Sequence, residues 1–178
     1  MTKIIAFTGS NHSKSINQHL LKHAASLIEN HEVEVLDLRD YESPMFSLDL
    51  EATEGQPAIL KKLEAKISES STLLIAVPEY NGFMPSFFKN IIDWLSRINR
   101  AFLKDKKVIL LSTSPGKYGG KQSLEHTASI LPRFGGEVIA TFSLGSFYEA
   151  VNLENRFTFT DVEEEKKLNE VLNNIKSN

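Results

Sequence analysis

The sequence contains no cysteine, and this single absence excludes several kinds of chemistry. Disulfides, zinc held by thiolates, iron–sulfur clusters and a cysteine nucleophile all depend on that residue. If the protein has a redox role, the electrons must therefore be handled by a bound organic cofactor.

A charge excess of one sign and a long apolar run are also missing. Lys and Arg number 20 against 23 for Asp and Glu, and the formal net charge of -3 does not favour binding to nucleic acid through a broad basic face. No apolar run approaches the roughly 18 residues of a membrane-spanning helix, and the first residues turn polar too early for a secretory signal. We therefore expect a cytoplasmic protein that binds neither nucleic acid nor a membrane.

What the chain does have is the length and composition of an ordinary globular domain. It contains 178 residues, of which 41% are hydrophobic and 24% are charged. A chain of this length buries roughly 70% of its unfolded surface, which suffices for a core without covalent cross-links. No linker or internal repeat divides it, so residues 1–178 are predicted to form one domain.

Short apolar runs alternate along the chain with longer amphipathic stretches. The runs predict five strands, at residues 3–8, 32–38, 72–77, 107–113 and 137–143. The stretches predict five helices, at residues 15–29, 57–67, 85–98, 120–134 and 161–175, and Pro132 is expected to end or kink the fourth. This order predicts an α/β fold, a doubly wound parallel sheet with helices on both faces.

The loops after the first, third and fourth strands are the places to look for a ligand, because ligands bind beyond the carboxyl ends of parallel strands where the winding reverses. The first loop, residues 9–15, is rich in hydroxyls and runs into a predicted helix. Hydroxyls, free N–H groups and the positive end of a helix dipole favour a phosphate. The spacing fits neither the P-loop nor the dinucleotide motif. The alternative is an ordinary turn with Ser13 or Ser15 as helix cap.

The second loop, residues 78–84, places Tyr80, Asn81 and Gly82 directly after a buried strand. A tyrosine can stack on a flat ring, an amide offers donor and acceptor, and glycine allows positive φ or close backbone approach. An ordinary Asn-Gly turn explains the same residues equally well. The third loop, residues 114–120, has three glycines and one proline, and composition alone predicts a mobile surface turn.

Three motifs coincide with these loops. The most specific is P-E-Y-N-G-x-x-P-x-x-x-K-N-x-x-D-W-x-S-R at residues 78–97, and the weaker ones are G-S-x-x-x-x-S-x-N at 9–17 and S-P-G-x-x-G-G at 114–120. With them the chain resembles the NADPH-dependent FMN reductase family of flavodoxin-like proteins, which includes quinone, azo-compound and chromate reductases. The resemblance implies strand order 2-1-3-4-5, bound FMN, and NADPH or NADH as co-substrate. It also implies hydride transfer to the flavin and onward to a small acceptor, such as a quinone, free flavin, azo compound or metal oxyanion.

The resemblance further assigns roles to residues of the three loops. The FMN phosphate would be surrounded by Ser10, His12, Ser15 and Asn17. The ribityl chain and the isoalloxazine ring would be lined by Pro78, Glu79, Tyr80, Asn81 and Gly82. The opposite edge of the flavin would be closed by Ser114 and Gly116. Because the flavin performs the redox step, no catalytic side chain and no metal site are predicted.

At three positions the chain departs from the family pattern. His12 stands where the family commonly has an arginine, so the phosphate loses a permanently charged, bidentate partner. Ser86 replaces a common glycine, and Phe83 replaces a commonly small polar residue. Phe83 is therefore expected to narrow the substrate side of the flavin and to change the preferred acceptor.

His19 and His23 are expected on a solvated helix face.

The helix at residues 85–100 has an apolar face with an arc of about 160°. Its apolar residues are Phe87, Phe88, Ile91, Ile92, Trp94, Leu95 and Ile98. Core packing explains part of this face, and the resemblance implies dimers or tetramers with flavins near the subunit boundary. We expect a homodimer that uses part of this helix, with the loop of Pro44, Met45 and Phe46 near a flavin.

Two other classes of function stay open on the sequence. A flavodoxin-like electron carrier would bind FMN without oxidising a nicotinamide, although such carriers usually have a more acidic surface than a net charge of -3 indicates. A non-redox regulatory or scaffold protein of the same fold would have lost FMN, and His12 keeps that alternative open. Flavin absorbance and NADPH turnover separate the three classes.

Overall fold

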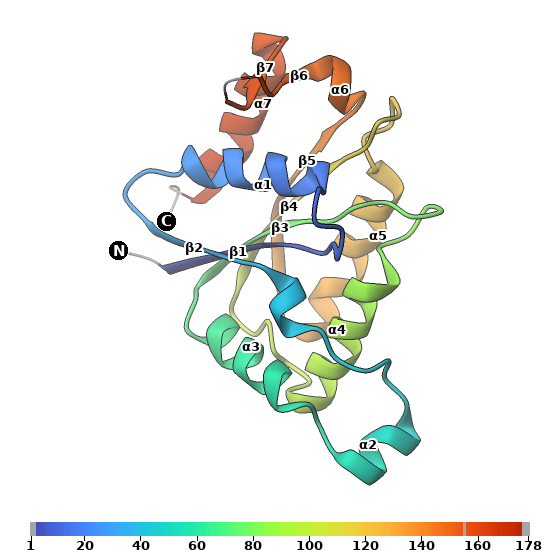
Figure 1. The fold of residues 1–178 in the computed structure, drawn as a ribbon. Coiled ribbons are helices and arrows are strands. Elements are labelled where there is room, and N and C mark those ends of the chain that lie inside the picture. Colours follow the sequence, from blue (N-terminus) through green and yellow to red (C-terminus); the bar gives the residue numbers. More distant parts are fainter. Residues whose placement is uncertain (1–2, 155, 176–178) are drawn as a thin grey trace.

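Five parallel strands form the centre of the molecule (Figure 1). The computed structural model describes residues 3–154 and 156–175. The strands are β1 (Lys3–Thr8), β2 (Glu32–Leu36), β3 (Thr72–Ala76), β4 (Lys107–Thr113) and β5 (Glu137–Leu144). They pair in the order β2-β1-β3-β4-β5, which confirms the predicted fold class and strand order.

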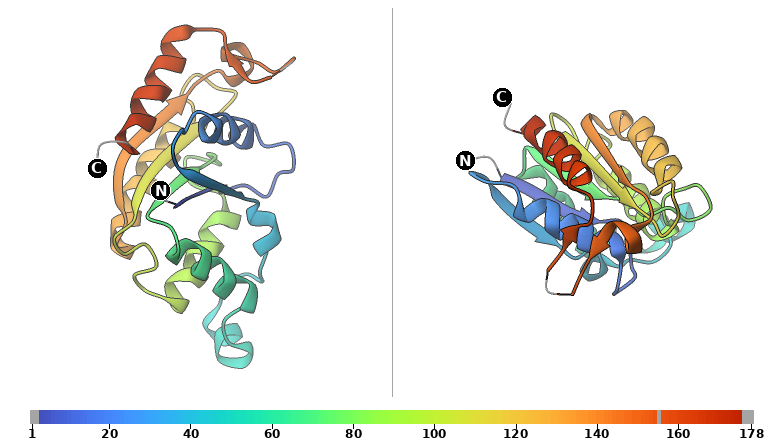
Figure 2. Two further views of the ribbon diagram at one scale, coloured as in Figure 1. Left: turned by 90° about the vertical axis from the view of Figure 1, so that its left-hand side faces the viewer. Right: turned by 90° about the horizontal axis from the view of Figure 1, so that it is seen from above.

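Helices cover both faces of the sheet, as Figure 2 shows. On one face lie α1 (Ile16–Ser26) and α7 (Val162–Leu172), and on the other α3 (Ala58–Ser68), α4 (Ser86–Ile98) and α5 (Lys121–Ile130). Successive strand residues point to opposite faces, so Ile4 and Ala6 join the core under α1 and α7, whereas Ile5 and Phe7 join the core under α3 and α4. None of the helices in the described ranges is both long and apolar enough to cross a membrane.

The two long stretches between regular elements, residues 39–56 and 144–160, contain short elements that the sequence pattern did not predict. The first holds α2 (Leu48–Glu54), which follows a 3₁₀ turn at Leu38–Tyr41. The second holds α6 (Phe147–Ala150) and an antiparallel hairpin of β6 (Val151–Asn152) and β7 (Thr158–Phe159). Two further 3₁₀ turns, Leu131–Phe134 and Asn173–Ile175, extend α5 and α7, and the first contains Pro132, as expected.

The wide apolar face of α4 is largely buried within the chain itself. Phe88, Trp94 and Leu95 are at most 3% exposed. The loop that leads to α2 covers part of the helix. The indole N–H of Trp94 donates to the Pro44 carbonyl of this loop at 2.8 Å. The Phe46 ring meets the Trp94 ring edge-on at 5.0 Å. Intramolecular packing therefore accounts for most of the arc, and the predicted homodimer is left with less of this helix than expected.

The expectation that His23 lies on a solvated helix face is wrong. The β6–β7 hairpin folds back over α1, and the Phe157 ring stacks on the His23 ring at 4.3 Å with an interplanar angle of 16°. Phe159 meets the same imidazole edge-on at 5.6 Å. His19, one helical turn earlier, is exposed as expected. The spacing of apolar residues in α1 could not predict the burial of His23, because Phe157 and Phe159 lie in a distant segment without regular periodicity.

Candidate functional site

A cavity of about 210 Å³ lies at the carboxyl ends of β1, β3 and β4, where the strand order predicts a ligand. Most of the predicted contact residues meet on its wall. The first loop contributes Ser10, His12, Ser15 and Asn17. The second and third loops contribute Pro78, Glu79, Tyr80 and Ser114. The folded chain thus brings together three loops that are far apart in sequence.

Three predicted residues do not line this cavity, and several others do. Asn81, Gly82 and Gly116 are absent from its wall. The residues that sequence reasoning missed are Lys14, Ile16, Thr113, Pro115 and Tyr148. Lys14, Ile16, Thr113 and Pro115 adjoin predicted residues along the chain, so proximity in sequence was the available signal. Tyr148 lies on α6, and no motif pointed to it.

The start of α1 forms part of the cavity wall. Ser15 occupies the N-cap position and is only 6% exposed, yet its hydroxyl makes no capping hydrogen bond. The first turn contains no acidic residue. An ordinary cap would satisfy the free N–H groups of a helix start, and here neither a cap nor a carboxylate does so. Uncommitted N–H groups at the positive end of a helix dipole attract an anion.

Gly9 is explained by packing against α4. A Cβ atom at this position would lie 2.7 Å from Cγ of Phe88, a distance that real side chains do not reach. The Gly9 N–H donates to the Ala76 carbonyl at 2.9 Å, which prolongs the sheet by one residue before the loop turns away. The glycine therefore lets the first loop begin close to α4, and the next residue, Ser10, reaches the cavity wall.

Asn17 ties the first loop to the third. Its amide nitrogen donates to the Thr113 carbonyl and its amide oxygen accepts from the Thr113 N–H, both at 2.9 Å. Asn17 is 3% exposed, so this pair of bonds is shielded from water. An asparagine amide has two hydrogens, and one stays uncommitted. In this structure Asn17 bonds the first turn of α1 to the end of β4. Its contact with a phosphate stays a prediction.

The second loop is a tight two-residue turn that is fastened to α5. The Tyr80 N–H donates to the Phe83 carbonyl at 2.8 Å and the Phe83 N–H donates back to Tyr80 at 3.1 Å. Asn81 and Gly82 have φ angles of 54° and 83°, as the type I′ geometry of an Asn-Gly turn requires. Asn81 and Gly82 thus shape the turn, and Tyr80 and Phe83 pair across its base.

The base of this turn is held by the start of α5. The Ser123 hydroxyl donates to the Pro78 carbonyl at 2.9 Å, and the Ser123 N–H donates to the Glu79 carboxylate at 3.1 Å. Glu79 therefore accepts from the first turn of a helix, where the dipole favours a negative charge. These two bonds position Pro78 and Glu79 through contacts within the chain itself.

The third loop is exposed at residues 115–118, as expected for a surface turn, and it is bonded to the segment that follows β5. The Gly116 carbonyl accepts from the Ser114 hydroxyl at 3.1 Å and from the Ser146 N–H at 2.9 Å. The Phe147 N–H donates to the Ser114 carbonyl at 3.1 Å. These bonds join the loop to the start of α6, which brings Tyr148 to the rim of the cavity. Gly116 serves through its backbone and not as a wall residue.

A second hollow, of about 450 Å³, adjoins the first at Tyr80, whose side chain lines both. Its other walls include Asn81, Phe83, Met84 and His126. The Phe83 ring is 56% exposed and meets the His126 ring edge-on at 4.5 Å. Small-molecule sites usually measure about 300 to 1,000 Å³, and the two adjoining hollows together fall within that range.

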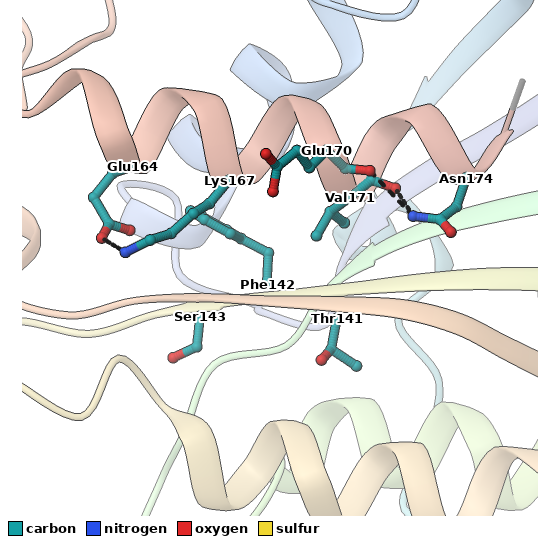
Figure 3. Close-up of a pocket in the computed structure, with 8 residues that line it drawn as sticks. All are labelled: Thr141, Phe142, Ser143, Glu164, Lys167, Glu170, Val171 and Asn174. Carbon is teal, nitrogen blue, oxygen red and sulfur yellow. Dashed lines mark hydrogen bonds and ion pairs between the residues drawn. The ribbon is translucent and has the colours of Figure 1, made fainter.

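A third hollow, of about 480 Å³, lies beside β5 and α7 and contains none of the predicted site residues (Figure 3). Phe142 points toward α7, whereas Thr141 and Ser143 point to the opposite side of the strand. Three of its polar side chains are already paired: Lys167 bonds to Glu164 at 2.6 Å, and the Asn174 amide donates to the Val171 carbonyl at 3.0 Å. We therefore assign the ligand site to the loops and not to this surface.

The donor set of the loop cavity fits FMN. A phosphate needs hydrogen-bond donors and positive potential, which the uncapped start of α1 and the buried Ser15 hydroxyl supply. A flat ring system needs an aromatic or apolar wall, which Pro78, Tyr80 and Tyr148 supply. Within the described part of the chain, the buried Thr8 hydroxyl also has no hydrogen-bond partner. It lies at the end of β1, just before this loop.

Comparison with known proteins agrees with this fit. Residues 2–149 match the family described as NADPH-dependent FMN reductase. An uncharacterized protein of Mycoplasma pneumoniae is 36% identical over 129 residues, which cover 70% of this chain and 75% of that protein. A quinone reductase of Escherichia coli K12 is 36% identical over 88 residues, or 49% of this chain and 47% of that enzyme. The match thus spans about half the length of the latter relative.

A solved structure extends the likeness to nearly the whole chain. FerB, a flavoenzyme NAD(P)H:(acceptor) oxidoreductase from Paracoccus denitrificans, has a TM-score of 0.77 and 25% identity, with 98% of this chain and 94% of that one covered. The family match, the shared fold and the donor set of the cavity lead to one conclusion. The chain belongs to the NADPH-dependent FMN reductase family, a family of oxidoreductases that use FMN and NAD(P)H.

Proposed function

We propose that this protein is an FMN-dependent NAD(P)H oxidoreductase that reduces a small acceptor of the quinone class. The observation that carries the proposal is that one cavity joins an uncapped helix start to the P-E-Y-N-G turn. The first feature suits a phosphate and the second a flat ring, and residues of both line the same cavity. The names of the E. coli quinone reductase and of FerB support a quinone or a similar acceptor.

In this proposal the chain binds and orients the cofactor. When bound, FMN supplies the chemistry of accepting a hydride and passing the electrons on. Ser10, Ser15 and the first N–H groups of α1 hold the phosphate, whose charge the helix dipole favours. Tyr80 would flank the ring, and it would help to hold the ring because its turn is bonded to α5. No side chain of the cavity is required to act as an acid or a base.

The second hollow is the proposed entrance for the acceptor. It shares Tyr80 with the cofactor cavity, and its wall carries the exposed Phe83 ring against His126. An aromatic ring of this kind favours a flat, weakly polar molecule, because stacked or edge-on ring contacts are favourable by about 0.5 to 1.5 kcal/mol. A quinone has these properties, whereas a hydrated metal oxyanion does not. The wall therefore favours quinones among the possible acceptors.

The test begins with the purified protein reconstituted with excess FMN and desalted. We expect a yellow protein with flavin absorbance, and steady-state oxidation of NADPH when a benzoquinone is added. A colourless protein after desalting would contradict every flavin-dependent function. A yellow protein that does not oxidise NADPH or NADH with any acceptor would instead be an electron carrier, the main alternative.

A further inference from the structure

Lys14 is the only permanently positive side chain on the wall of the FMN cavity, among the residues that the structure describes. The other groups there are hydroxyls, amides, apolar and aromatic side chains, the imidazole of His12 and the carboxylate of Glu79. Without a side chain of fixed positive charge, a phosphate here would rely on hydrogen bonds and on the dipole of α1. Lys14, two residues after His12, supplies such a positive charge.

The electrostatic surroundings of Lys14 are unfavourable unless an anion is present. Lys14 immediately precedes the N-cap of α1, where the helix dipole is positive and disfavours a second positive charge. No described residue forms an ion pair with it, and the first turn of α1 holds no carboxylate. Positive potential from the side chain and from the helix therefore adds up at this part of the cavity, where no described carboxylate is paired with Lys14.

A buried hydroxyl beside Lys14 points to the same occupant. Ser15 lines the cavity and is 6% exposed, and its hydroxyl makes no hydrogen bond with a described residue. This hydroxyl is therefore free to donate to an anion inside the cavity. A phosphate oxygen beside Lys14 would accept from this hydroxyl and from the ammonium group together.

We propose that Lys14 binds the phosphate of FMN and thereby makes the site select FMN over riboflavin. This inference rests on the proposed function and adds the residue that sets cofactor specificity. Riboflavin has the same ring and ribityl chain but no phosphate, so it gains nothing from Lys14. The ammonium group is a compact point charge on a flexible stem, which suits a phosphate held mainly by N–H groups and hydroxyls.

The experiment measures the dissociation constants of FMN and riboflavin from the quenching of flavin fluorescence. Lys14→Gln is expected to weaken FMN binding by roughly tenfold or more and to leave riboflavin binding unchanged. Lys14→Arg should keep most of the FMN affinity, because the charge is retained. Lys22→Gln is the matched control, since Lys22 is an exposed lysine of α1 that does not line this cavity, and both constants should stay at the wild-type values.

A second measurement separates this inference from the proposed function. Inorganic phosphate should raise the melting temperature of the flavin-free wild type and have little effect on Lys14→Gln. Equal FMN affinity in wild type and Lys14→Gln, or an equal loss for riboflavin, would overturn the inference and leave the function intact. If the wild type binds neither flavin, the proposed function fails, and the phosphate titration still decides whether Lys14 holds an anion.

Discussion

His23 combines a titratable ring with an apolar environment. Its imidazole lies between α1 and the β6–β7 hairpin, stacked on Phe157, and its Nε2 atom is buried without a hydrogen-bond partner among the described residues. This burial lowers the pKa of His23 below the ordinary value of 6.5. The nearby Glu165 carboxylate opposes the shift and the Arg156 guanidinium adds to it, and both effects are smaller than that of burial.

The stability of the protein should therefore depend on pH through His23. The unfolded chain binds a proton near pH 6.5 and the folded chain only at lower pH, so the free energy of unfolding decreases as the pH falls from about 6.5 through the folded pKa. Urea unfolding between pH 5 and 8 measures this. The His23→Gln variant should lose that part of the slope, whereas His19→Gln, on the exposed side of the same helix, should follow the wild type. Parallel curves for wild type and His23→Gln would contradict the prediction.

Asn17 yields a second prediction at this scale. Asn17→Ala removes both bonds to Thr113 and leaves a buried N–H and a buried carbonyl without those partners. We expect a loss of about 2 to 3 kcal/mol in the free energy of unfolding. Asn11→Ala is the control, because Asn11 is exposed in the same loop, and it should change stability by less than about 0.5 kcal/mol. A neutral Asn17→Ala would show that the bridge between the loops is not stabilising.

Among the elements, the turn at residues 80–83 determines where two aromatic side chains point. Gly82 has φ of 83°, and a Cβ atom there would lie 2.8 Å from the Gln122 amide oxygen. Gly116, in the third loop, has no such constraint, because a Cβ atom would meet only the Ser114 hydroxyl at 3.9 Å. The two glycines of the candidate site therefore differ in the physical reason for their presence.

Substitution of the two glycines tests this difference. Gly82→Ala should destabilise the protein by about 1 kcal/mol or more, because a side chain is strained at positive φ and crowds Gln122. Gly116→Ala should be close to neutral in thermal unfolding. Because the strained turn carries Tyr80 and Phe83, Gly82→Ala should also weaken FMN binding. Equal melting temperatures for the two variants would contradict this account.

The five strands and five long helices could be predicted because their apolar residues repeat with the period of each element. The hairpin of β6 and β7 could not, since strands of two residues have no measurable period and its ring contact with His23 joins segments far apart in the sequence. The position of the candidate site at the loops after β1, β3 and β4 could be predicted from the loop motifs and the expected strand order. Tyr148 could not be predicted to line the cavity, because it belongs to no motif and reaches the cavity only through the position of α6 in the fold.

For the whole molecule, a homodimer stays a proposal. The α4 face that suggested it is mostly buried in the core of the chain itself, and in part beneath Pro44 and Phe46, which line neither of the two adjoining hollows. What is left for a partner includes exposed apolar side chains at Met45, Tyr80 and Phe83. We expect sedimentation at micromolar concentration to show a dimer that Phe83→Ser weakens. A monomer at every concentration would exclude the dimer.

The family match stops at residue 149, but the hydrophobic core does not. Leu168 and Leu172 of α7 are buried in the same cluster as Ile109 and Leu111 of β4. We propose that the described chain folds as one cooperative unit. Residue 149, where the family match ends, would then not be the end of a domain that folds on its own. A chain ended at residue 149 should lose cooperative thermal unfolding, measured by circular dichroism. A truncated chain with a sharp transition would show that α7 is an addition to a domain already stable without it.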